Sequence, residues 1–162
     1  MGPDEVDELV QAWRRERADL DLAPVEVFSR IERLARLLDL ARREAFIEQS
    51  IEPWEFDVLA ALRRTGKPYQ LSPGQLLRET MVTSGTMTNR IDRLTERGLV
   101  DRSPDPHDRR GVLVGLTNAG KTAVDGAFGT LIARERDLLA ELSAPERETL
   151  ASLLKRLMKP LR

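Results

Sequence analysis

The sequence predicts a mainly α-helical protein with one small β-hairpin. Over most of the chain, apolar residues recur every three or four positions, which is the period of an amphipathic helix. From Leu99 the period changes, and two short runs, LVDRS and GVLVGLT, flank a stretch rich in proline, aspartate and glycine. With 162 residues, 41% of them hydrophobic, the chain is expected to form one well-buried domain.

The first 50 residues are expected to form two helices. The segment PDEVDELVQAWRRERA starts with Pro3 and several carboxylates and ends in arginines, an order of charges that suits the helix dipole. Pro24 interrupts this helix, because the residue before a proline is pushed out of helical geometry. A long helix is then predicted from Pro24 to about Ser50, with a stripe formed by Val27, Ile31, Leu34, Leu38, Ala41 and Ala45.

Three shorter helices are predicted next. Pro53 begins a helix that Gly66 ends. Residues 72–81 form the second, which starts with a capping-box pattern and a proline at the first helical position. Residues 83–97 form the third, which ends at Gly98 and places Met87, Ile91 and Leu94 on its buried side.

Two long helices complete the chain after the hairpin, at about residues 118–142 and 144–159. Ser143 and Glu146 form a capping box at the start of the second. Both carry apolar stripes wider than a chain of this length can cover by itself, so we expect a homodimer built from the terminal helices. An intramolecular helical bundle is the alternative. The stripe residues are Val124, Phe128, Leu131, Leu138, Leu139, Leu142, Leu150, Leu153, Leu154, Leu157, Met158 and Leu161.

Two short helices followed by a charged hairpin are the layout of a winged helix-turn-helix. The single domain, 1–162, therefore divides into a helical extension and dimerisation helix (1–50), a winged helix-turn-helix lobe (51–121) and C-terminal dimerisation helices (122–162). Residues 72–121 carry eight basic and six acidic side chains, whereas residues 1–50 carry eight basic and twelve acidic ones. This distribution favours a polyanion partner at the middle of the chain, and we expect a double-stranded DNA operator.

The helix over residues 83–97 presents small polar side chains on the face opposite its buried stripe. Such side chains contact base edges and phosphates in a major groove. Asp92 and Glu96 lie on the same face, which indicates that the N-terminal half of the helix enters the groove. Arginines at the hairpin tip can reach a neighbouring minor groove or phosphates. The expected DNA-binding residues are Ser84, Thr86, Thr88, Asn89, Arg93, Arg109 and Arg110.

The composition argues against several other classes of protein. Cysteine is absent and His107 is the single histidine, so a thiolate nucleophile, a Ser-His-Asp hydrolase and a multi-histidine zinc site are not expected. We expect no cofactor and no metal. No apolar run approaches the roughly 18 residues that span a membrane, and the acidic N-terminus is unlike a targeting peptide, so a cytoplasmic protein without membrane association is expected.

One motif suggests an enzyme instead. Residues 115–122, GLTNAGKT, match the phosphate-binding pattern G-x-x-x-x-G-K-[ST] and lie between an apolar strand and a helix. A nucleotide-binding loop of this kind needs a parallel sheet, however, and the remaining chain is predicted to be helical. We therefore expect no enzymatic activity. Magnesium-dependent nucleotide binding would favour the enzyme, and a helical dimer without DNA binding is a further alternative.

The run LTERGLVDRSPDPHDRRGVLVGLTNAGK resembles the MarR family of transcriptional regulators. The resemblance rests on a D-x-R stretch followed by L-T-x-x-G, matched by Asp108, Arg110, Leu116, Thr117 and Gly120, and extends over about residues 25–160. It implies a homodimer of winged helix-turn-helix subunits that binds a pseudo-palindrome and is released by a small ligand. A ligand-independent DNA-binding dimer is the alternative.

A narrower resemblance involves the N-terminal extension, PWEFDVLAALRR and TSGTMTNRIDRL. These segments are similar to the urate-responsive branch of MarR proteins and its relatives that respond to citrate or trans-aconitate. The resemblance implies that the ligand-binding residues are Trp13, Asp57, Arg90 and Arg102. Independently, Arg90 lies about 70° from the centre of the buried stripe, so it should lean toward the protein.

We hypothesise that, without ligand, Asp57 neutralises one or both arginines and that an anionic effector competes for them. A permanent structural ion pair is the alternative. Trp54, near the start of its helix, is expected in the core.

Overall fold

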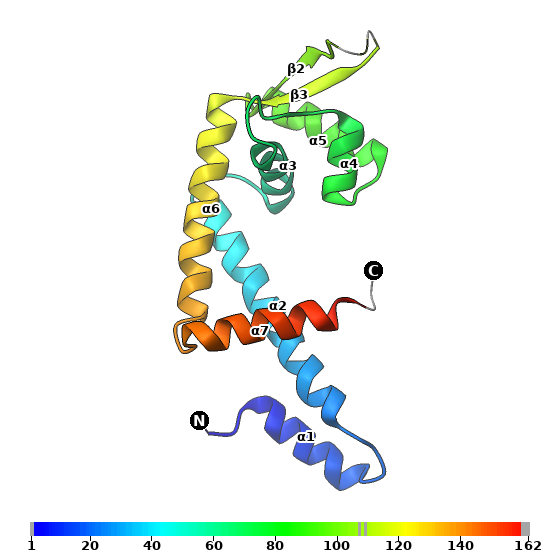
Figure 1. Ribbon diagram of the computed structural model, residues 1–162, viewed down its shortest axis with the longest axis vertical. Coiled ribbons are helices and arrows are strands. Elements are labelled where there is room, and N and C mark those ends of the chain that lie inside the picture. The colour runs from blue at the N-terminus through cyan, green and yellow to red at the C-terminus, as the bar shows by residue number, and fades with distance from the viewer. Residues whose placement is uncertain (1, 107, 109, 160–162) are drawn as a thin grey trace. The chain divides into compact units, whose positions relative to one another are not determined.

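A computed structural model describes residues 2–106, 108 and 110–159 (Figure 1). It confirms the mainly helical fold with a small antiparallel sheet. The chain separates into two compact units, residues 1–42 and 43–162. The first contains α1 and most of α2, and the second contains the remaining elements.

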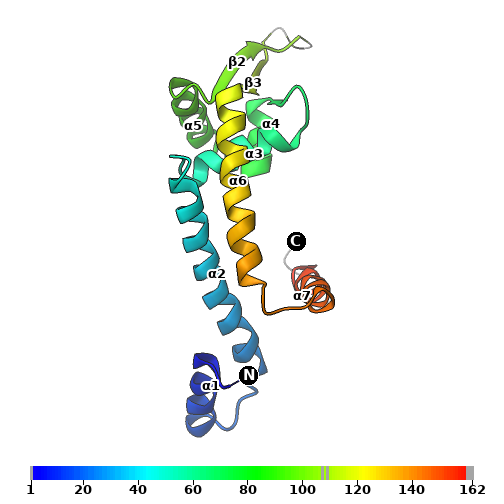
Figure 2. The ribbon, with the colours of Figure 1, turned by 90° about the vertical axis from the view of Figure 1, so that its left-hand side faces the viewer.

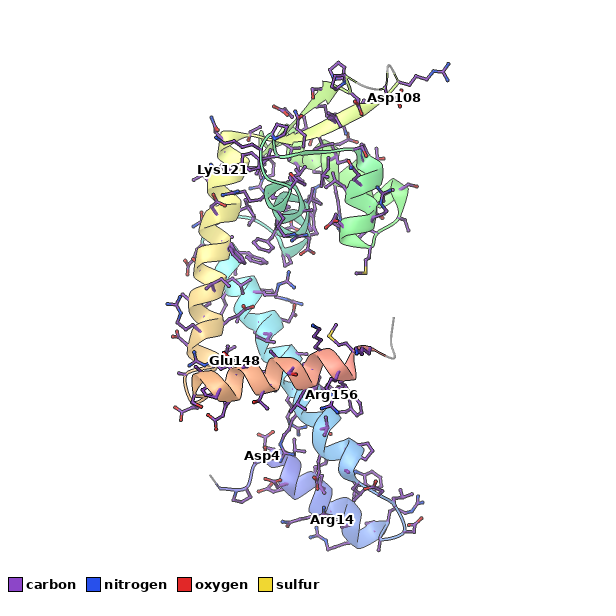
Figure 3. All side chains as sticks on the ribbon, viewed as in Figure 1. Asp4, Arg14, Asp108, Lys121, Glu148 and Arg156 are labelled. Atoms are coloured by element: carbon purple, nitrogen blue, oxygen red, sulfur yellow. The ribbon has the colours of Figure 1, made fainter. Side chains whose placement is uncertain are left out.

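The N-terminal unit consists of α1 (Glu5–Glu16) and the larger part of α2 (Ala23–Ile47). Val6 and Val10 on α1 pack with Leu22 in a small core of their own. Asp4 caps α1 by accepting hydrogen bonds from the N–H groups of Val6 and Asp7. Figure 3 labels Asp4 at the start of this helix and Arg14 further along it. The two predicted N-terminal helices are therefore present.

Arg30 on α2 connects the two helices of this unit. Its guanidinium donates hydrogen bonds to the carboxylates of Asp4 (2.9 Å) and Asp7 (2.7 Å). The Arg30 side chain and the Asp7 N–H stabilise the ionised form of Asp4, which lowers the pKa of Asp4 to about 2. Ion pairs at the surface thus supplement a small apolar contact.

The second unit follows the order that the sequence predicts, with one additional strand. Its elements are α3 (Pro53–Arg64), β1 (Gln70–Leu71), α4 (Pro73–Thr80), α5 (Ser84–Glu96), β2 (Val100–Pro104), β3 (Val112–Leu116), α6 (Asn118–Leu138) and α7 (Ala144–Leu157).

The core of this unit lies where α3, α4, α5 and the sheet meet. The stripe of α5 is buried, as predicted, in one cluster with leucines of α3 and α4 and valines of the sheet. Burying one such side chain contributes about 1.5–3 kcal/mol to stability. Fully or almost fully buried members are Val58, Leu59, Leu62, Leu76, Met87, Ile91, Leu94, Val100 and Val114. This cluster holds α5 against the rest of the lobe.

The sheet has the order β1-β3-β2, and both pairings are antiparallel. The β2–β3 hairpin extends away from the helices, with Asp108 at its far end (Figures 1 and 3). β1 is too short to show a periodic pattern, and for that reason the sequence does not predict it. Its pairing of Gln70 with Gly115 and of Leu71 with Val114 joins the base of the hairpin to the segment before α4.

Thr117 begins α6 by accepting a hydrogen bond from the N–H of Gly120 (3.0 Å), while its own hydroxyl donates to the Gly98 carbonyl. Gly120 is buried where the helix passes the chain before β2. A Cβ atom at this position would lie 2.0 Å from the carbonyl oxygen of Leu99. The glycine is therefore explained by close packing, and the antiparallel sheet lacks the parallel strands that a nucleotide-binding loop requires.

α6 ends at Leu138, four residues before the predicted end. Short-range hydrogen bonds from the N–H of Leu139 to Arg136 and of Ala140 to Asp137 tighten the chain into a turn there. Apolar residues continue through this turn, so periodicity alone extends the helix too far. α7 then begins at the predicted capping box, in which the Ser143 hydroxyl donates to Glu146.

α7 points away from α6 and buries none of its side chains (Figure 2). Its apolar side chains are exposed, together with several on α6. These are Phe128, Ile132, Leu138, Leu139, Leu150, Leu153, Leu154, Leu157 and Met158. Of the predicted stripes, Val124 and Leu131 on α6 are buried within the chain, and Leu161 lies outside the described residues. Most of the other stripe residues remain uncovered by the described part of the chain. Across the described residues, no helix is long and apolar enough to cross a membrane.

Candidate nucleic-acid interface

The turn between α4 and α5 sets the angle of the helix pair. Ser72 caps the start of α4, where its hydroxyl accepts a hydrogen bond from the Gln75 N–H (3.3 Å), and Met81 caps the end. Met81 adopts a left-handed conformation, with φ of 54°, and its N–H bonds to the Leu77 carbonyl. This conformation reverses the chain in a few residues, so that α5 starts at Ser84. The helix-turn-helix predicted from the sequence is present.

α5 turns its N-terminal polar residues toward solvent. Ser84, Thr86, Thr88, Asn89 and Arg93 are all exposed. The Thr88 hydroxyl donates to the Ser84 carbonyl (3.2 Å), and the Thr86 hydroxyl shares a hydrogen bond with Thr83. The helix therefore presents hydroxyl, amide and guanidinium groups on one side, as a major-groove reader requires.

The wing supplies a second exposed polar segment. Hydrogen bonds from Gly111 to the Asp108 carbonyl and from Asp105 to the Gly111 carbonyl close its tip. The Arg110 N–H is fixed by the Asp108 carboxylate at 2.9 Å, and its side chain is exposed. Arg109, the other predicted wing contact, lies outside the described residues. Arg110 is thus carried at the end of a closed loop.

A hollow of about 490 Å³ lies beside Trp54 and α5. Its walls are formed by Trp54, Gly85, Thr86, Asn89, Arg90 and Arg93. The guanidinium carbon of Arg93 lies 4.8 Å from the centre of the indole ring, and that of Arg90 lies 5.5 Å away. Trp54 packs against the core, as expected, but it is only partly buried and its ring also faces these two arginines.

Glu52 lies next to this hollow and contacts two of its residues. Its carboxylate accepts a hydrogen bond from the Trp54 indole N–H (2.6 Å) and a longer one from Arg93 (3.5 Å). One acidic and two basic side chains therefore meet at the indole, which leaves a net positive charge.

A buried carboxylate connects the end of α5 to the segment before α3. The Glu55 side chain is 1% exposed, and it accepts hydrogen bonds from the Glu52 N–H and the Arg97 guanidinium. Arg97 also donates to the Ser50 carbonyl (2.7 Å). Burial makes a carboxylate costly unless it is paired, and these partners supply the pairing. The C-terminal end of α5 is thereby fixed to residues 50–55.

The four ligand-binding residues implied by the resemblance occupy different elements. Trp13 lies on α1 in the N-terminal unit and is 49% exposed. Asp57 is an exposed residue of α3, and Arg90 is half-buried against Trp54, consistent with its predicted lean toward the protein. Arg102 on β2 pairs with Asp92 of α5. The predicted competition of an anion with Asp57 for these arginines stays a prediction.

A second hollow, of about 350 Å³, lies between α3 and α6. Its walls are largely apolar, and they include Phe56 and Phe128, whose ring centres are 6.5 Å apart. Arg63 at its edge is paired with Asp125 at 2.8 Å. The hollow beside Trp54, with two arginines and one acidic neighbour, favours a small anion more strongly.

Sequence reasoning missed Glu52, Glu55 and Arg97 altogether. Glu52 and Arg93 are 41 residues apart, and Glu55 and Arg97 are 42 apart, so no local pattern reveals either pair. One signal was available, because Glu55 sits on the apolar side of α3 between Trp54 and Phe56. A carboxylate there needs a cation from elsewhere in the chain.

The fold and the exposed face of α5 together define a winged helix-turn-helix DNA-binding protein. The model of the MarR family matches residues 49–111. The HTH-type transcriptional regulator PecS of Dickeya dadantii is 39% identical over 157 residues, 97% of this chain and 95% of that protein. The chain belongs to the MarR family of transcriptional regulators, which are not enzymes.

Solved structures agree with this assignment. A mutant of MarR from E. coli complexed with operator DNA matches with a TM-score of 0.67 and 27% identity, over 96% of this chain and 99% of that one. BpsR of Bordetella bronchiseptica, whose DNA binding is regulated by 6-hydroxynicotinic acid, matches with a TM-score of 0.67 and 26% identity, over 82% and 93%.

Proposed function

We propose that this protein is a transcriptional repressor that binds a pseudo-palindromic operator as a homodimer and is released by a small anionic ligand. The observation that carries the proposal is the exposed polar face of α5, residues 84–93, held on a packed lobe beside the wing. The complex of the MarR relative with operator DNA supports double-stranded operator DNA as the partner. The proposal retains the cytoplasmic location expected from the sequence.

The dimer is supported by the apolar side chains that α6 and α7 leave exposed. A second copy of the chain, related by a twofold axis, would cover them and place two α5 helices on successive turns of DNA. The two half-sites of the operator would then be about 10 base pairs apart, centre to centre.

The effector is proposed to be urate, citrate or trans-aconitate, bound through Trp13, Asp57, Arg90 and Arg102. The regulation of BpsR by 6-hydroxynicotinic acid supports a small acidic effector in this family. The ion pair of Arg102 with Asp92 favours the second candidate, a DNA-binding dimer without an effector, because Arg102 already has an acidic partner.

Fluorescence anisotropy on a duplex from the promoter of the protein's own gene tests these proposals. We expect salt-dependent binding, and release by one of the three anions. Binding that none of them disturbs would leave the effector-independent dimer. Absence of binding at low salt, on this duplex and on tiled neighbouring sequences, would contradict the regulator.

A change in the wing provides a second test. Replacing Arg110 by alanine should weaken binding and reduce the salt slope by roughly 0.9, the value of one phosphate contact. An unchanged slope would remove the wing from the interface.

A further inference from the structure

The hollow beside Trp54 brings two guanidinium groups together near one indole ring. Arg90 and Arg93 are three residues apart on α5, so their side chains leave the helix on the same side. Each lies within 6 Å of the indole centre, where a cation is attracted by the face of the ring. A guanidinium beside the face of an aromatic ring can keep N–H groups at its edge available for an anion.

Neutral donors line the same hollow. Asn89 supplies an amide and Thr86 a hydroxyl, while Gly85 has no side chain to narrow the entrance. A Cβ atom at Gly85 would meet nothing within 4 Å, so the surface at this point is open. Planar charged donors together with neutral donors suit an anionic oxygen such as that of a phosphate or carboxylate.

In the free protein, the Glu52 carboxylate neutralises part of this positive charge. Its carboxylate is more than half exposed and lies 3.5 Å from Arg93, a long contact for a charged hydrogen bond. The same carboxylate is held more firmly by the Trp54 indole N–H at 2.6 Å. An incoming anion therefore competes with Glu52 for Arg93.

We propose that the hollow lined by Trp54, Arg90 and Arg93 is an anion site that binds a backbone phosphate of the operator, with Glu52 as its internal competitor. The inference rests on the proposed DNA binding and goes beyond it, because it adds Trp54 and Glu52 to the interface. It also gives Arg90 a role toward DNA. The hollow opens on the exposed face of α5 that carries Asn89, and phosphates flank the groove that such a face enters.

The salt dependence of DNA binding tests the site directly. Replacing Glu52 by glutamine keeps a side-chain oxygen for the indole N–H and removes the competing charge. We expect Glu52→Gln to bind the duplex about 3- to 10-fold more tightly at low salt, with a slope of log K against log salt up to about 0.9 steeper. Loss of a carboxylate beside a cation that contacts DNA should thus strengthen binding.

The matched control is Asp125→Asn. Asp125 is also a partly exposed carboxylate paired with an arginine, Arg63, but it lies on α6 outside the hollow. The Asp125→Asn substitution changes the net charge of the protein by the same amount as Glu52→Gln. If Glu52→Gln and Asp125→Asn alter affinity and slope equally, the effect is general electrostatics and the proposal is overturned.

Arg90 gives the complementary measurement. Arg90→Ala should make the slope shallower by about 0.9 and weaken operator and unrelated duplexes by similar factors, as expected for a phosphate contact. Arg90→Lys should recover part of the slope, because the charge is kept while the planar guanidinium beside Trp54 is lost. A wild-type slope in Arg90→Ala would contradict the site.

The source of the anion is distinguished by fluorescence. In a Trp13→Phe variant, Trp54 is the single tryptophan. We expect its emission to change when duplex is added and to stay constant with inorganic phosphate at equal ionic strength. A saturable change with inorganic phosphate that Arg90→Ala abolishes would keep the anion site but overturn its assignment to DNA. No change with either of them would overturn the site itself.

Failure of this inference is separable from failure of the proposed function. The wild-type protein is measured first on the same duplex. If it binds neither this duplex nor the tiled neighbouring sequences, the regulator is contradicted; if it binds while the hollow variants match their controls, only the phosphate site is lost.

Discussion

The winged helix-turn-helix lobe buries its apolar side chains, whereas α7 leaves its apolar side chains exposed. In the lobe, Leu62, Leu76 and Leu94 are fully buried among residues of the same chain. In α7, Leu153 is 52% exposed, and no side chain of the helix is buried. An isolated helix of 14 residues is marginal in water, so α7 needs a contact that the described residues of this chain do not supply. The comparison teaches that the lobe builds its core from residues of one chain, whereas α7 leaves its apolar side chains for the partner in the proposed dimer.

The largest expected effect is a loss of stability in the lobe. Leu94→Ala removes buried methyl groups between α5 and the rest of the core and should reduce the free energy of unfolding by about 2–5 kcal/mol. Denaturant unfolding measures this loss at fixed protein concentration. A loss below about 1 kcal/mol would mean that the lobe is less tightly packed than its burial indicates.

A charge on α7 should act on assembly instead. Leu153→Glu places a carboxylate on the exposed apolar stripe, and burying it unpaired in a dimer costs several kcal/mol. We expect the dissociation constant of the dimer to rise by about 100-fold or more, measured by sedimentation equilibrium. Glu148→Gln, a polar change on the same helix (labelled in Figure 3), is the control and should leave it unchanged. A Leu153→Glu protein that stays dimeric would move the interface away from α7.

The same change, glycine to alanine, at two positions of α6 sharpens the comparison between the packed and the uncovered parts of the protein. Gly120→Ala would force a Cβ atom against the Leu99 carbonyl and should destabilise the lobe by about 1–3 kcal/mol. Gly129→Ala meets nothing within 4 Å and should stabilise the helix by about 0.5–1 kcal/mol. Thermal unfolding of both variants measures whether each change lowers or raises the stability of the protein. A destabilising Gly129→Ala would show that a partner subunit packs closely at that point.

The smallest effect is expected in the N-terminal unit. The pKa of Asp4 is about 2, below its ordinary value of 3.8. The ionised Asp4 carboxylate therefore stabilises the folded state fully above pH 3.8, and this stabilisation is lost as the pH falls through 2. Carboxyl NMR of Asp4 measures the pKa directly. Arg30→Gln should return it toward the ordinary value, because Arg30 is the main cause of the shift. An Asp4 that titrates normally in the wild-type protein would contradict the ion pair.

Local signals explain why most of the fold was predictable from the sequence. The Ser72 and Ser143 capping boxes start α4 and α7 where expected, and the stripe of α5 is buried as its period requires. β1 was missed because two residues show no period, and α6 was made too long because apolar residues continue past Leu138. Periodicity reports burial and helical phase, but it does not report where a chain turns.

The candidate interface was predictable to a smaller extent. The polar face of α5 follows from helical spacing alone. The contacts of Trp54 and Glu52 with α5 depend on how α3 packs, which is set by side chains distant in the sequence. Arg102 illustrates the same limit, since its partner Asp92 lies on the neighbouring helix and was assigned from the sequence to the DNA-facing side.

The pairing of β1 with β3 has a practical consequence for redesign. It anchors the base of the hairpin at Gly115 and Val114, and the hydrogen bonds of Asp105 and Gly111 close the tip separately. The β2–β3 ladder holds the strands in register from Val100 and Leu116 up to Pro104 and Val112, where the loop begins. We therefore expect a loop of different length or charge, grafted between residues 104 and 112, to leave the lobe folded, which makes the wing the natural place to change the preferred operator of this regulator.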